Sequence, residues 1–421
     1  MNFIDLFAGA GGLSEGFIRS GYIPLAHVEK DEAACNTLKT RIAYHYLKNE
    51  NKLDHYVQYL KGSIDRKTLY SFIPQEKLDS VINLEISDKN NKRIQKVIDK
   101  KLDGNAVDLI IGGPPCQAYS IAGRSRSKSK MKGDPRNFLF REYAKYLSKY
   151  KPNALVFENV VGLKSAQGGQ YLIQMKNLFC QIGYVIKLYT LHANDFGVLQ
   201  NRKRIIIVGV KKNTGLVLPA LEKVKIKHNF LVKDIFEDLP SLKAGEGENK
   251  FLKYPVKANN YLKKFSIRND LEVLTQHVAR PHSENDKNIY KIAVEKWEKE
   301  SLRLNYNDLP KNLQTHKNTK SFVDRYKVVA QNLEYSHTVV AHISKDGHYY
   351  IHPDIVQNRS ISVRESARLQ SFPDDYYFEG RKENNNRTSA FKQIGNAVPP
   401  LMAEKIAALM RPIFNQEITK N

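Results

Sequence analysis

Residues 3–12 read FIDLFAGAGG, an apolar run followed by glycines. Residues 3–7 have the composition of a buried strand, and the glycines predict a tight turn into a helix over residues 12–20. Glycines in such a turn let the backbone approach a ligand at the N-terminus of the helix. A dinucleotide-binding fingerprint requires a third glycine where this chain has Ser14, so hydride chemistry is disfavoured. Glu29 ends the next predicted strand, where a carboxylate accepts hydrogen bonds from ribose hydroxyls, so a nucleoside-containing cofactor is favoured over a purely structural turn.

Strand-like and helical segments alternate through the first half of the chain. Strands are predicted at residues 3–7, 22–28, 56–60, 107–111, 154–157 and 205–208, and helices at 12–20, 31–46, 140–148 and 171–180. This alternation predicts an α/β fold with a mostly parallel sheet. The charged segment 67–103 is interpreted as a helical insertion at the edge of the sheet. After residue 211 the alternation stops, which indicates a second, irregular domain, and an apolar helix is predicted at 399–410.

The composition limits the class of protein. Of 421 residues, 41% are hydrophobic and 26% are charged, which excludes a disordered chain. The 67 Lys and Arg residues exceed the 44 Asp and Glu residues, for a net charge of +23. This excess favours a polyanionic partner, although a generally Lys-rich proteome would also produce it. No segment reaches the roughly 18 apolar residues of a membrane helix and no signal peptide is readable, so we expect a cytoplasmic protein without a membrane partner.

Cys116 differs from the other two cysteines of the chain. Cys35, Cys116 and Cys180 are far apart and form no CxxC pair, so neither a disulfide framework nor a metal site is predicted. Cys116 lies in GGPPCQ, residues 112–117, directly after the predicted strand 107–111. The carboxyl ends of parallel strands are where open α/β sheets bind their ligands. Cys35 and Cys180 are expected to be inert, whereas Cys116 is a candidate functional thiol.

Two further polar groups are predicted at the same edge of the sheet. Glu158 ends the predicted strand 154–157, and a carboxylate there is a candidate for protonating a substrate. Arg202 and Arg204 lie in QNRKR, residues 200–204, immediately before the predicted strand 205–208. Arginines at that position can hold an anionic or carbonyl oxygen, and the alternative is a solvated basic edge.

Six motifs follow one another along the chain: FAGAGG (7–12), PPCQ (114–117), ENV (158–160), QNRKR (200–204), RESARLQ (364–370) and QIGNAVPP (393–400). Taken in this order, they resemble the motifs of the DNA (cytosine-5) methyltransferases of bacterial restriction-modification systems. The resemblance covers nearly all of residues 1–210 and 336–410. It implies a Rossmann-like, S-adenosylmethionine-dependent methyltransferase domain with a smaller, irregular target-recognition domain. The catalytic and cofactor-binding domain would comprise residues 1–211 and 390–421, and the target-recognition domain residues 212–389.

The resemblance also implies which residues bind the cofactor, S-adenosyl-L-methionine. They would be Phe7, Gly9, Gly11, Glu29, Ser63, Ile64, Pro115, Leu139, Asn396 and Val398. Two positions depart from the family pattern on the adenine side. Ser63 stands where the family commonly has an acidic residue, and Lys30 where some relatives have an aromatic ring.

The reaction implied by the resemblance is methylation of cytosine at carbon 5. Cys116 would add as a thiolate to carbon 6 of the ring, and Glu158 would hold or protonate ring nitrogen 3. Arg204, together with Arg202, would bind the ring carbonyl oxygen. The cytosine would have to be flipped out of the duplex first. The loop 124–133, which alternates cations with small residues, is interpreted as a mobile, phosphate-gripping lid.

The expected partner is double-stranded DNA, so the protein would be DNA-associated in the cytoplasm. A cognate restriction endonuclease would act on the same site without necessarily contacting the chain, which we expect to be a monomer. Two alternatives stay open. A relative of the same fold could methylate cytosine in RNA, although the large irregular segment favours reading a duplex. A non-catalytic DNA-binding protein would not need Cys116, Glu158 and Arg204, which are all present.

Overall fold

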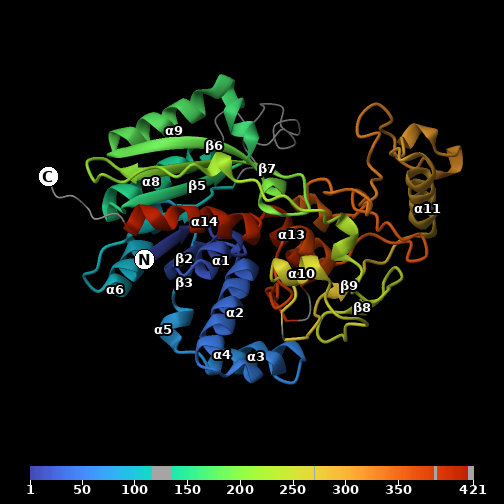
Figure 1. The fold of residues 1–421 in the computed structure, drawn as a ribbon, viewed down its shortest axis with the longest axis horizontal. Coiled ribbons are helices and arrows are strands. Elements are labelled where there is room, and N and C mark those ends of the chain that lie inside the picture. The colour runs from blue at the N-terminus through green and yellow to red at the C-terminus, as the bar shows by residue number, and fades with distance from the viewer. Residues whose placement is uncertain (116–134, 270, 384–385, 416–421) are drawn as a thin grey trace.

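A seven-stranded sheet forms the centre of the protein (Figure 1). The computed structural model describes residues 1–115, 135–269, 271–383 and 386–415. The strand order is β3-β2-β1-β4-β5-β7-β6, in which the first five strands are parallel and β7 is antiparallel to both β5 and β6. The strands are β1 (Asn2–Leu6), β2 (Ile23–Glu29), β3 (Val81–Asn83), β4 (Leu109–Gly112), β5 (Ala154–Asn159), β6 (Tyr184–His192) and β7 (Lys203–Lys211). The predicted α/β class with a mostly parallel sheet is confirmed.

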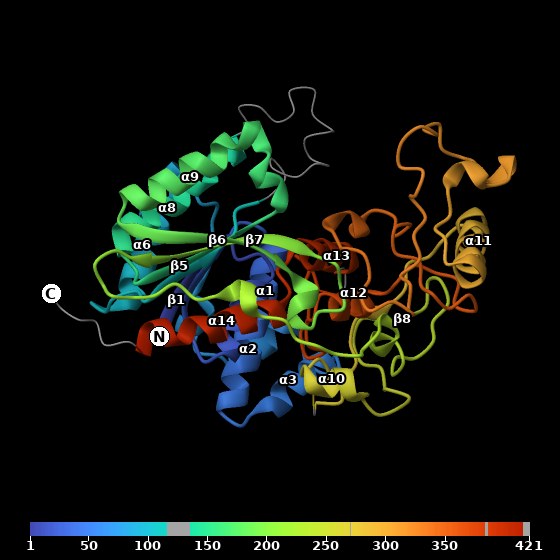
Figure 2. The same ribbon diagram turned by 45° about the horizontal axis from the view of Figure 1, so that its top comes forward.

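Successive residues of the central strands point to opposite faces of the sheet. In β5, Ala154 and Val156 join one hydrophobic core, while Leu155 and Phe157 join the other. Helices α6 (Asp88–Leu102), α8 (Leu139–Tyr150) and α9 (Gln170–Gln181) cover one face, and α1 (Gly12–Arg19) and α14 (Pro400–Asn415) cover the other (Figure 2). The helices predicted at 12–20, 140–148, 171–180 and 399–410 correspond to α1, α8, α9 and α14.

The last helix of the chain lies against the first. A Cβ on Gly16 would come within 2.3 Å of the backbone nitrogen of Glu404, so only glycine allows α1 and α14 to approach this closely. The Tyr22 hydroxyl donates to the carbonyl of Ala407 at 3.2 Å, and Arg19 pairs with Glu404 at 3.1 Å. The C-terminal segment is thereby part of the core that contains β1.

Two sequence predictions for the first half of the chain are wrong. Residues 56–60, predicted as a strand, belong to helix α3 (Leu53–Leu60), because Tyr56, Tyr59 and Leu60 are buried with the spacing of one helical face. Segment 67–103 is not an insertion, because it contains the edge strand β3 and the helix α6, whose Ile94 and Ile98 pack on the sheet. The other helices before β3 are α2 (Glu32–Asn49), α4 (Arg66–Ser71) and α5 (Gln75–Leu78).

Residues after β7 form few regular elements, as the sequence predicted. Besides α14 and short 3-10 turns, they are β8 (Gly247–Glu248), α10 (Asn260–Lys264), β9 (His277–Val278), α11 (Glu284–Glu300), α12 (Val363–Leu369) and α13 (Arg387–Asn396). α11 lies at the far end of the molecule from α9 (Figure 1) and has a small core of its own, including Tyr290 and Tyr306. The buried Arg368 guanidinium bonds Asp238 and Asp374 and so connects α12 with the irregular segment. The division at residues 211 and 390 stays a prediction.

Candidate active site

The turn between β1 and α1 has a left-handed backbone at Phe7 (φ 60°), Gly9 (φ 56°) and Gly11 (φ 81°). A Cβ on Gly11 would lie 2.8 Å from Cδ2 of Leu38 and 2.9 Å from the hydroxyl of Tyr376, so this position has no room for a side chain. A Cβ on Gly9, in contrast, would meet no atom within 4 Å. Open space therefore lies beside the turn at Gly9, where a ligand can approach the backbone.

Glu29 connects the end of β2 to this turn. One carboxylate oxygen accepts the amide of Gly9 at 2.8 Å, and the other accepts the amides of Lys30 at 2.9 Å and Asp31 at 2.8 Å. Burial raises the pKa of the Glu29 carboxyl although these amides favour its charged form. Glu29 and the glycine turn are thus held together at the carboxyl ends of neighbouring parallel strands.

The C-terminal segment reaches the same turn. A Cβ on Gly12 would come within 2.2 Å of the carbonyl oxygen of Val398 and 3.2 Å of Cβ of Ala397, so these two residues lie directly against the start of α1. Asn396 ends α13, just before this contact. The structure therefore brings Val398 to the start of α1 from the opposite end of the chain, and Asn396 lies two residues before Val398.

Glu158 and Arg204 form an ion pair at the ends of adjacent strands. Nε of Arg204, near the start of β7, lies 2.8 Å from a carboxylate oxygen of Glu158, near the end of β5, and only 11% and 14% of these side chains are exposed. A Cβ on Gly113 would lie 2.7 Å from the other carboxylate oxygen of Glu158. Asn159 donates to the carbonyl of Pro114 at 3.3 Å. The segment that leads to Pro115 is thus bonded to the strand that carries Glu158.

The family model for C-5 cytosine-specific DNA methylases matches residues 1–72 and 73–411. The chain belongs to this family. It is 42% identical over 449 aligned residues to the type II methyltransferase M.Bpa9945I of Bacillus paralicheniformis, covering 99% of both chains. It is 30% identical over 423 residues to the type II methyltransferase M.DdeI of Desulfomicrobium norvegicum, covering 97% of this chain and 88% of the relative.

A crystal structure shows a similar fold. It is described as a DNA modification methyltransferase encoded within an E. coli prophage, with a TM-score of 0.64, 23% identity, and coverage of 99% of this chain and 100% of that one. The family and the enzyme class expected from the sequence, a DNA (cytosine-5) methyltransferase, are confirmed.

Cys116, the expected methylase nucleophile, lies outside the described residues, as do Gln117 and the basic loop 124–133. Pro115 is described and is half-buried beside the Glu158 strand. Leu139 is half-buried at the first position of α8. Their proposed contacts with the cofactor stay predictions.

Arg202 bonds to backbone carbonyls in the described part of the chain, and its expected catalytic role stays a prediction. Its guanidinium is fully buried and donates to the carbonyls of Val339 at 2.7 Å, Gly395 at 3.3 Å and Ala397 at 2.7 Å. Residues two apart in an extended strand share a side, so both arginines fitted the sequence pattern equally well, but β7 begins at Lys203 and Arg202 lies before it. We infer that Arg202 holds the segment around Asn396, whereas Arg204 pairs with the Glu158 carboxylate.

Ser63 and Ile64 follow α3, and their expected contact with the cofactor stays a prediction. Ser63 is exposed in the link between α3 and α4, and Ile64 packs with Tyr59 and Leu69 in a separate core. The residue aligned with Glu29 on the neighbouring parallel strand is Asn83, whose amide donates to the carbonyls of Glu29 at 3.2 Å and Lys30 at 3.1 Å. Because β3 lies in the segment interpreted as an insertion, Asn83 was missed. The apolar pair Val81-Ile82 before it was the available signal.

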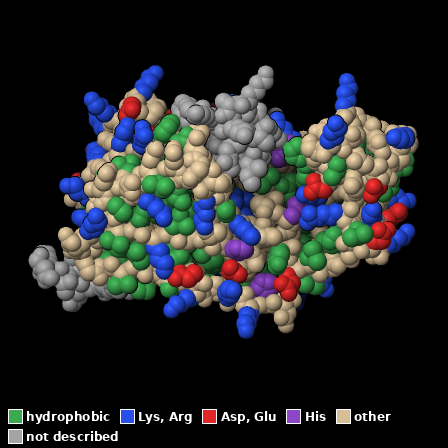
Figure 3. All heavy atoms as spheres, turned by 90° about the horizontal axis from the view of Figure 1, so that it is seen from above, with side chains coloured by type: hydrophobic (Ala, Val, Ile, Leu, Met, Phe, Trp, Pro, Cys, Tyr) green, Lys and Arg blue, Asp and Glu red, His purple; other side chains and the backbone are tan. Residues whose placement is uncertain are grey.

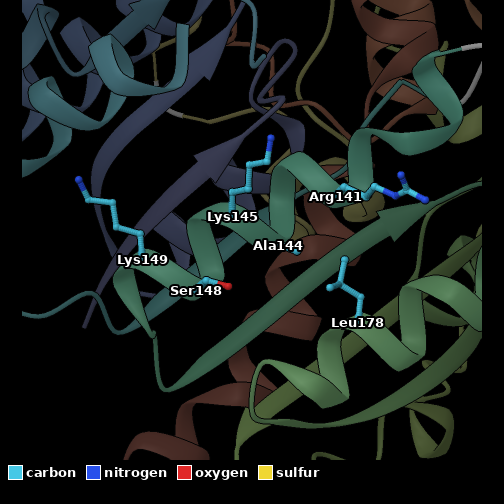
Figure 4. A pocket seen from close by; sticks show the side chains of 6 residues that line it. All are labelled: Arg141, Ala144, Lys145, Ser148, Lys149 and Leu178. Atoms are coloured by element: carbon cyan, nitrogen blue, oxygen red, sulfur yellow. The ribbon is translucent and has the colours of Figure 1, made fainter. Parts of the chain in front are cut away.

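A hollow between α8 and α9 is separate from the sheet edge that carries Glu158 and Arg204 (Figure 4). It is lined by Arg141, Ala144, Lys145, Ser148, Lys149 and Leu178, none of which is a predicted site residue. Lys145 pairs with Glu142 at 2.7 Å and Lys149 with Asp99 at 2.6 Å, so these cations have partners within the protein. In the described part of the chain there is no cluster of three metal-ligating side chains, and no helix there is long and apolar enough to cross a membrane.

Replacing Gly113 with alanine is expected to lower kcat by about 10²-fold, the scale of a misplaced catalytic group. The new Cβ would lie 2.7 Å from a carboxylate oxygen and 2.9 Å from the carbonyl oxygen of Glu158, so the Gly113 segment or Glu158 must shift and the pair with Arg204 is disturbed. Steady-state methylation kinetics measure the effect, and thermal unfolding checks that the chain is folded. A folded variant with the kcat of the wild type would show that the position of Glu158 is unimportant.

Proposed function

We propose that this methylase transfers a methyl group from S-adenosylmethionine to carbon 5 of a flipped-out cytosine in a specific duplex DNA sequence. The Glu158–Arg204 pair, held at 2.8 Å beside the segment that leads to Cys116, is the observation that carries the proposal. The two type II relatives, which match over nearly their whole length, support a role in a restriction-modification system. A cognate endonuclease would cut the same site in unmethylated DNA.

The β1–α1 turn fits the cofactor. Gly9 borders open space, and Glu29 lies at the end of the adjacent strand. Because Gly11 and Gly12 have no side chain, Leu38 and Val398 can pack directly against the turn. When bound, S-adenosylmethionine supplies an electrophilic methyl group to carbon 5. Phe7, Gly9, Gly11, Glu29, Asn396 and Val398 would bind it, with Asn83 beside Glu29 in place of Ser63.

The chain's own residues activate the cytosine ring, which is a poor nucleophile at carbon 5. The Cys116 thiolate adds to carbon 6, and Glu158 donates a proton to ring nitrogen 3, so negative charge does not build up there. Arg204 holds the Glu158 carboxyl in place and offers its remaining N–H donors to the ring carbonyl oxygen. After methylation a base removes the carbon-5 proton, the bond between the Cys116 sulfur and carbon 6 breaks to release the thiolate, and the proton on ring nitrogen 3 returns to Glu158.

The surface suits a polyanionic substrate. The net charge is +23, and Figure 3 shows Lys and Arg side chains over both ends of the molecule.

The irregular segment is bonded to the residues that precede Arg204. The amide of Asn201 donates to the Ser336 carbonyl at 2.8 Å, and the amide of Val339 donates to the Gln200 side chain at 2.9 Å. The irregular segment is therefore fixed beside the proposed reaction site.

Methyl transfer to DNA and to RNA tests the proposal directly. The full chain is incubated with methyl-labelled S-adenosylmethionine and either genomic duplex DNA or total RNA, and the products are digested to nucleosides. We expect label in 5-methyldeoxycytidine only, and bisulfite sequencing of the DNA then gives the recognised sequence. Label in RNA alone would favour the RNA alternative, and label in neither would refute the proposed activity.

Sequence choice is expected to reside in residues 212–345. Every proposed catalytic residue lies outside this segment, so grafting it into a family member with another target should transfer specificity and leave the chemistry to the host. Bisulfite sequencing of DNA from cells that express the chimera measures the target. An active chimera that keeps the target of the host would contradict the assignment.

A further inference from the structure

Tyr376 connects the segment after α12 to the glycine turn of β1–α1. Its side chain is 1% exposed, and its hydroxyl donates to the carbonyl of Ala10, between Gly9 and Gly11. The two residues are 366 positions apart in the sequence. This contact comes from the segment that the sequence assigned to target recognition, yet it is made to the turn proposed to bind the cofactor.

The ring and the backbone of Tyr376 are held in place by contacts with neighbouring residues. It packs against the rings of Phe372 and Phe378, with centroids 4.8 Å and 5.2 Å away. The Arg364 guanidinium donates to the Tyr376 carbonyl at 2.9 Å. The Arg41 guanidinium lies 4.8 Å from the ring centroid.

Arg41 is itself held in place from two sides. It pairs with Glu15 of α1 at 2.6 Å and with Asp375, the neighbour of Tyr376, at 2.7 Å. All three side chains are buried. The turn, α1 and the Tyr376 segment are therefore joined by one buried set of contacts, in which the hydroxyl of Tyr376 has a defined position.

The Gly11 amide donates to the Ala8 carbonyl at 2.9 Å and the Ser14 hydroxyl donates to the Gly11 carbonyl at 3.1 Å, and Tyr376 adds the contact to the Ala10 carbonyl between them. Gly9 and Gly11 lack the Cβ that would limit their backbone, and the hydroxyl of Tyr376 would be 2.9 Å from a Cβ on Gly11. We infer that Tyr376 is a positioning residue that holds the Ala10–Gly11 peptide in the conformation that binds the cofactor. This inference rests on the proposed use of S-adenosylmethionine at this turn.

Tyr376→Phe removes only the hydroxyl, and Tyr22→Phe is the matched control. Tyr22 is 2% exposed, and its hydroxyl also donates to a backbone carbonyl, that of Ala407 at 3.2 Å, on α14. Each variant loses one buried hydrogen bond, so both should lower the unfolding temperature to a similar extent. Isothermal titration of the full chain with S-adenosylmethionine should give a Kd about threefold to tenfold higher for Tyr376→Phe, the range expected for one hydrogen bond, and an unchanged Kd for Tyr22→Phe.

Hydrogen exchange without cofactor provides an independent measurement. Amides in a peptide covering residues 7–14 should exchange faster in Tyr376→Phe than in the wild type or Tyr22→Phe. An unchanged Kd in Tyr376→Phe, or an equal rise in both variants, would overturn the inference. If the wild type itself does not bind S-adenosylmethionine, the proposed cofactor is refuted and the inference falls with it; the exchange rates then decide only whether Tyr376 holds the turn.

Discussion

Replacing Cys116 with alanine is expected to lower the rate of methyl transfer by at least about 10⁴-fold, the scale of losing a nucleophile. Without the thiolate, carbon 6 is not attacked and carbon 5 stays too weak a nucleophile to accept a methyl group. DNA binding should persist, because contacts to phosphates and bases come from other residues. Labelled-methyl incorporation measures the first effect, and gel-shift titration with the recognised duplex measures the second.

Cys180→Ala is the control for this variant. Cys180 is an exposed free cysteine on α9, so its replacement removes one thiol of the same kind without approaching Glu158 or Arg204. Its activity should equal that of the wild type. Near-normal turnover in Cys116→Ala would remove the covalent mechanism.

Replacing Glu158 with glutamine is expected to lower kcat by about 10²–10⁴-fold, the contribution of a positioned general acid. Glutamine has nearly the same size and can still accept a hydrogen bond from Arg204, so the strands β5 and β7 should keep their positions. It cannot donate an acidic proton to the ring nitrogen. The Kd for DNA and the unfolding temperature should therefore change far less than kcat.

Glu222→Gln is the matched control, because Glu222 also pairs with a cation of the same sheet, Lys187 of β6, at 2.7 Å. Both of these side chains are about half exposed, at 50% and 45%, and such pairs contribute little. The kcat of Glu222→Gln should equal that of the wild type. A Glu158→Gln variant within threefold of the control would mean that this carboxylate does not take part in proton transfer.

The features predicted correctly from the sequence depend on local patterns. The β1–α1 turn follows from glycines in adjacent positions, and β4, β5 and β7 are continuous apolar runs because both of their faces are buried. β6 was missed because exposed and buried residues are mixed along it at the edge of the sheet. β3 has only three residues, and without it Asn83 cannot be recognised as the neighbour of Glu29.

The contacts that could not be predicted join residues far apart in the sequence. Nothing local distinguishes Arg202 from Arg204, yet one donates to the carbonyls around Asn396 and the other pairs with Glu158. Tyr376 reads as an ordinary core aromatic, and only the folded chain shows that its hydroxyl meets Ala10. Motif order therefore indicated the chemistry, whereas the direction of individual side chains required the structure.

Trapping with 5-fluorocytosine tests the central claim most directly. The full chain is incubated with S-adenosylmethionine and a duplex carrying 5-fluorocytosine at the methylated position, and the mixture is analysed by denaturing electrophoresis and peptide mass spectrometry. The fluorine cannot leave as the carbon-5 proton does, so the enzyme should remain covalently attached to DNA through Cys116. An enzyme that methylates the ordinary duplex but forms no adduct with the fluorinated one, or an adduct at another residue, would contradict the account.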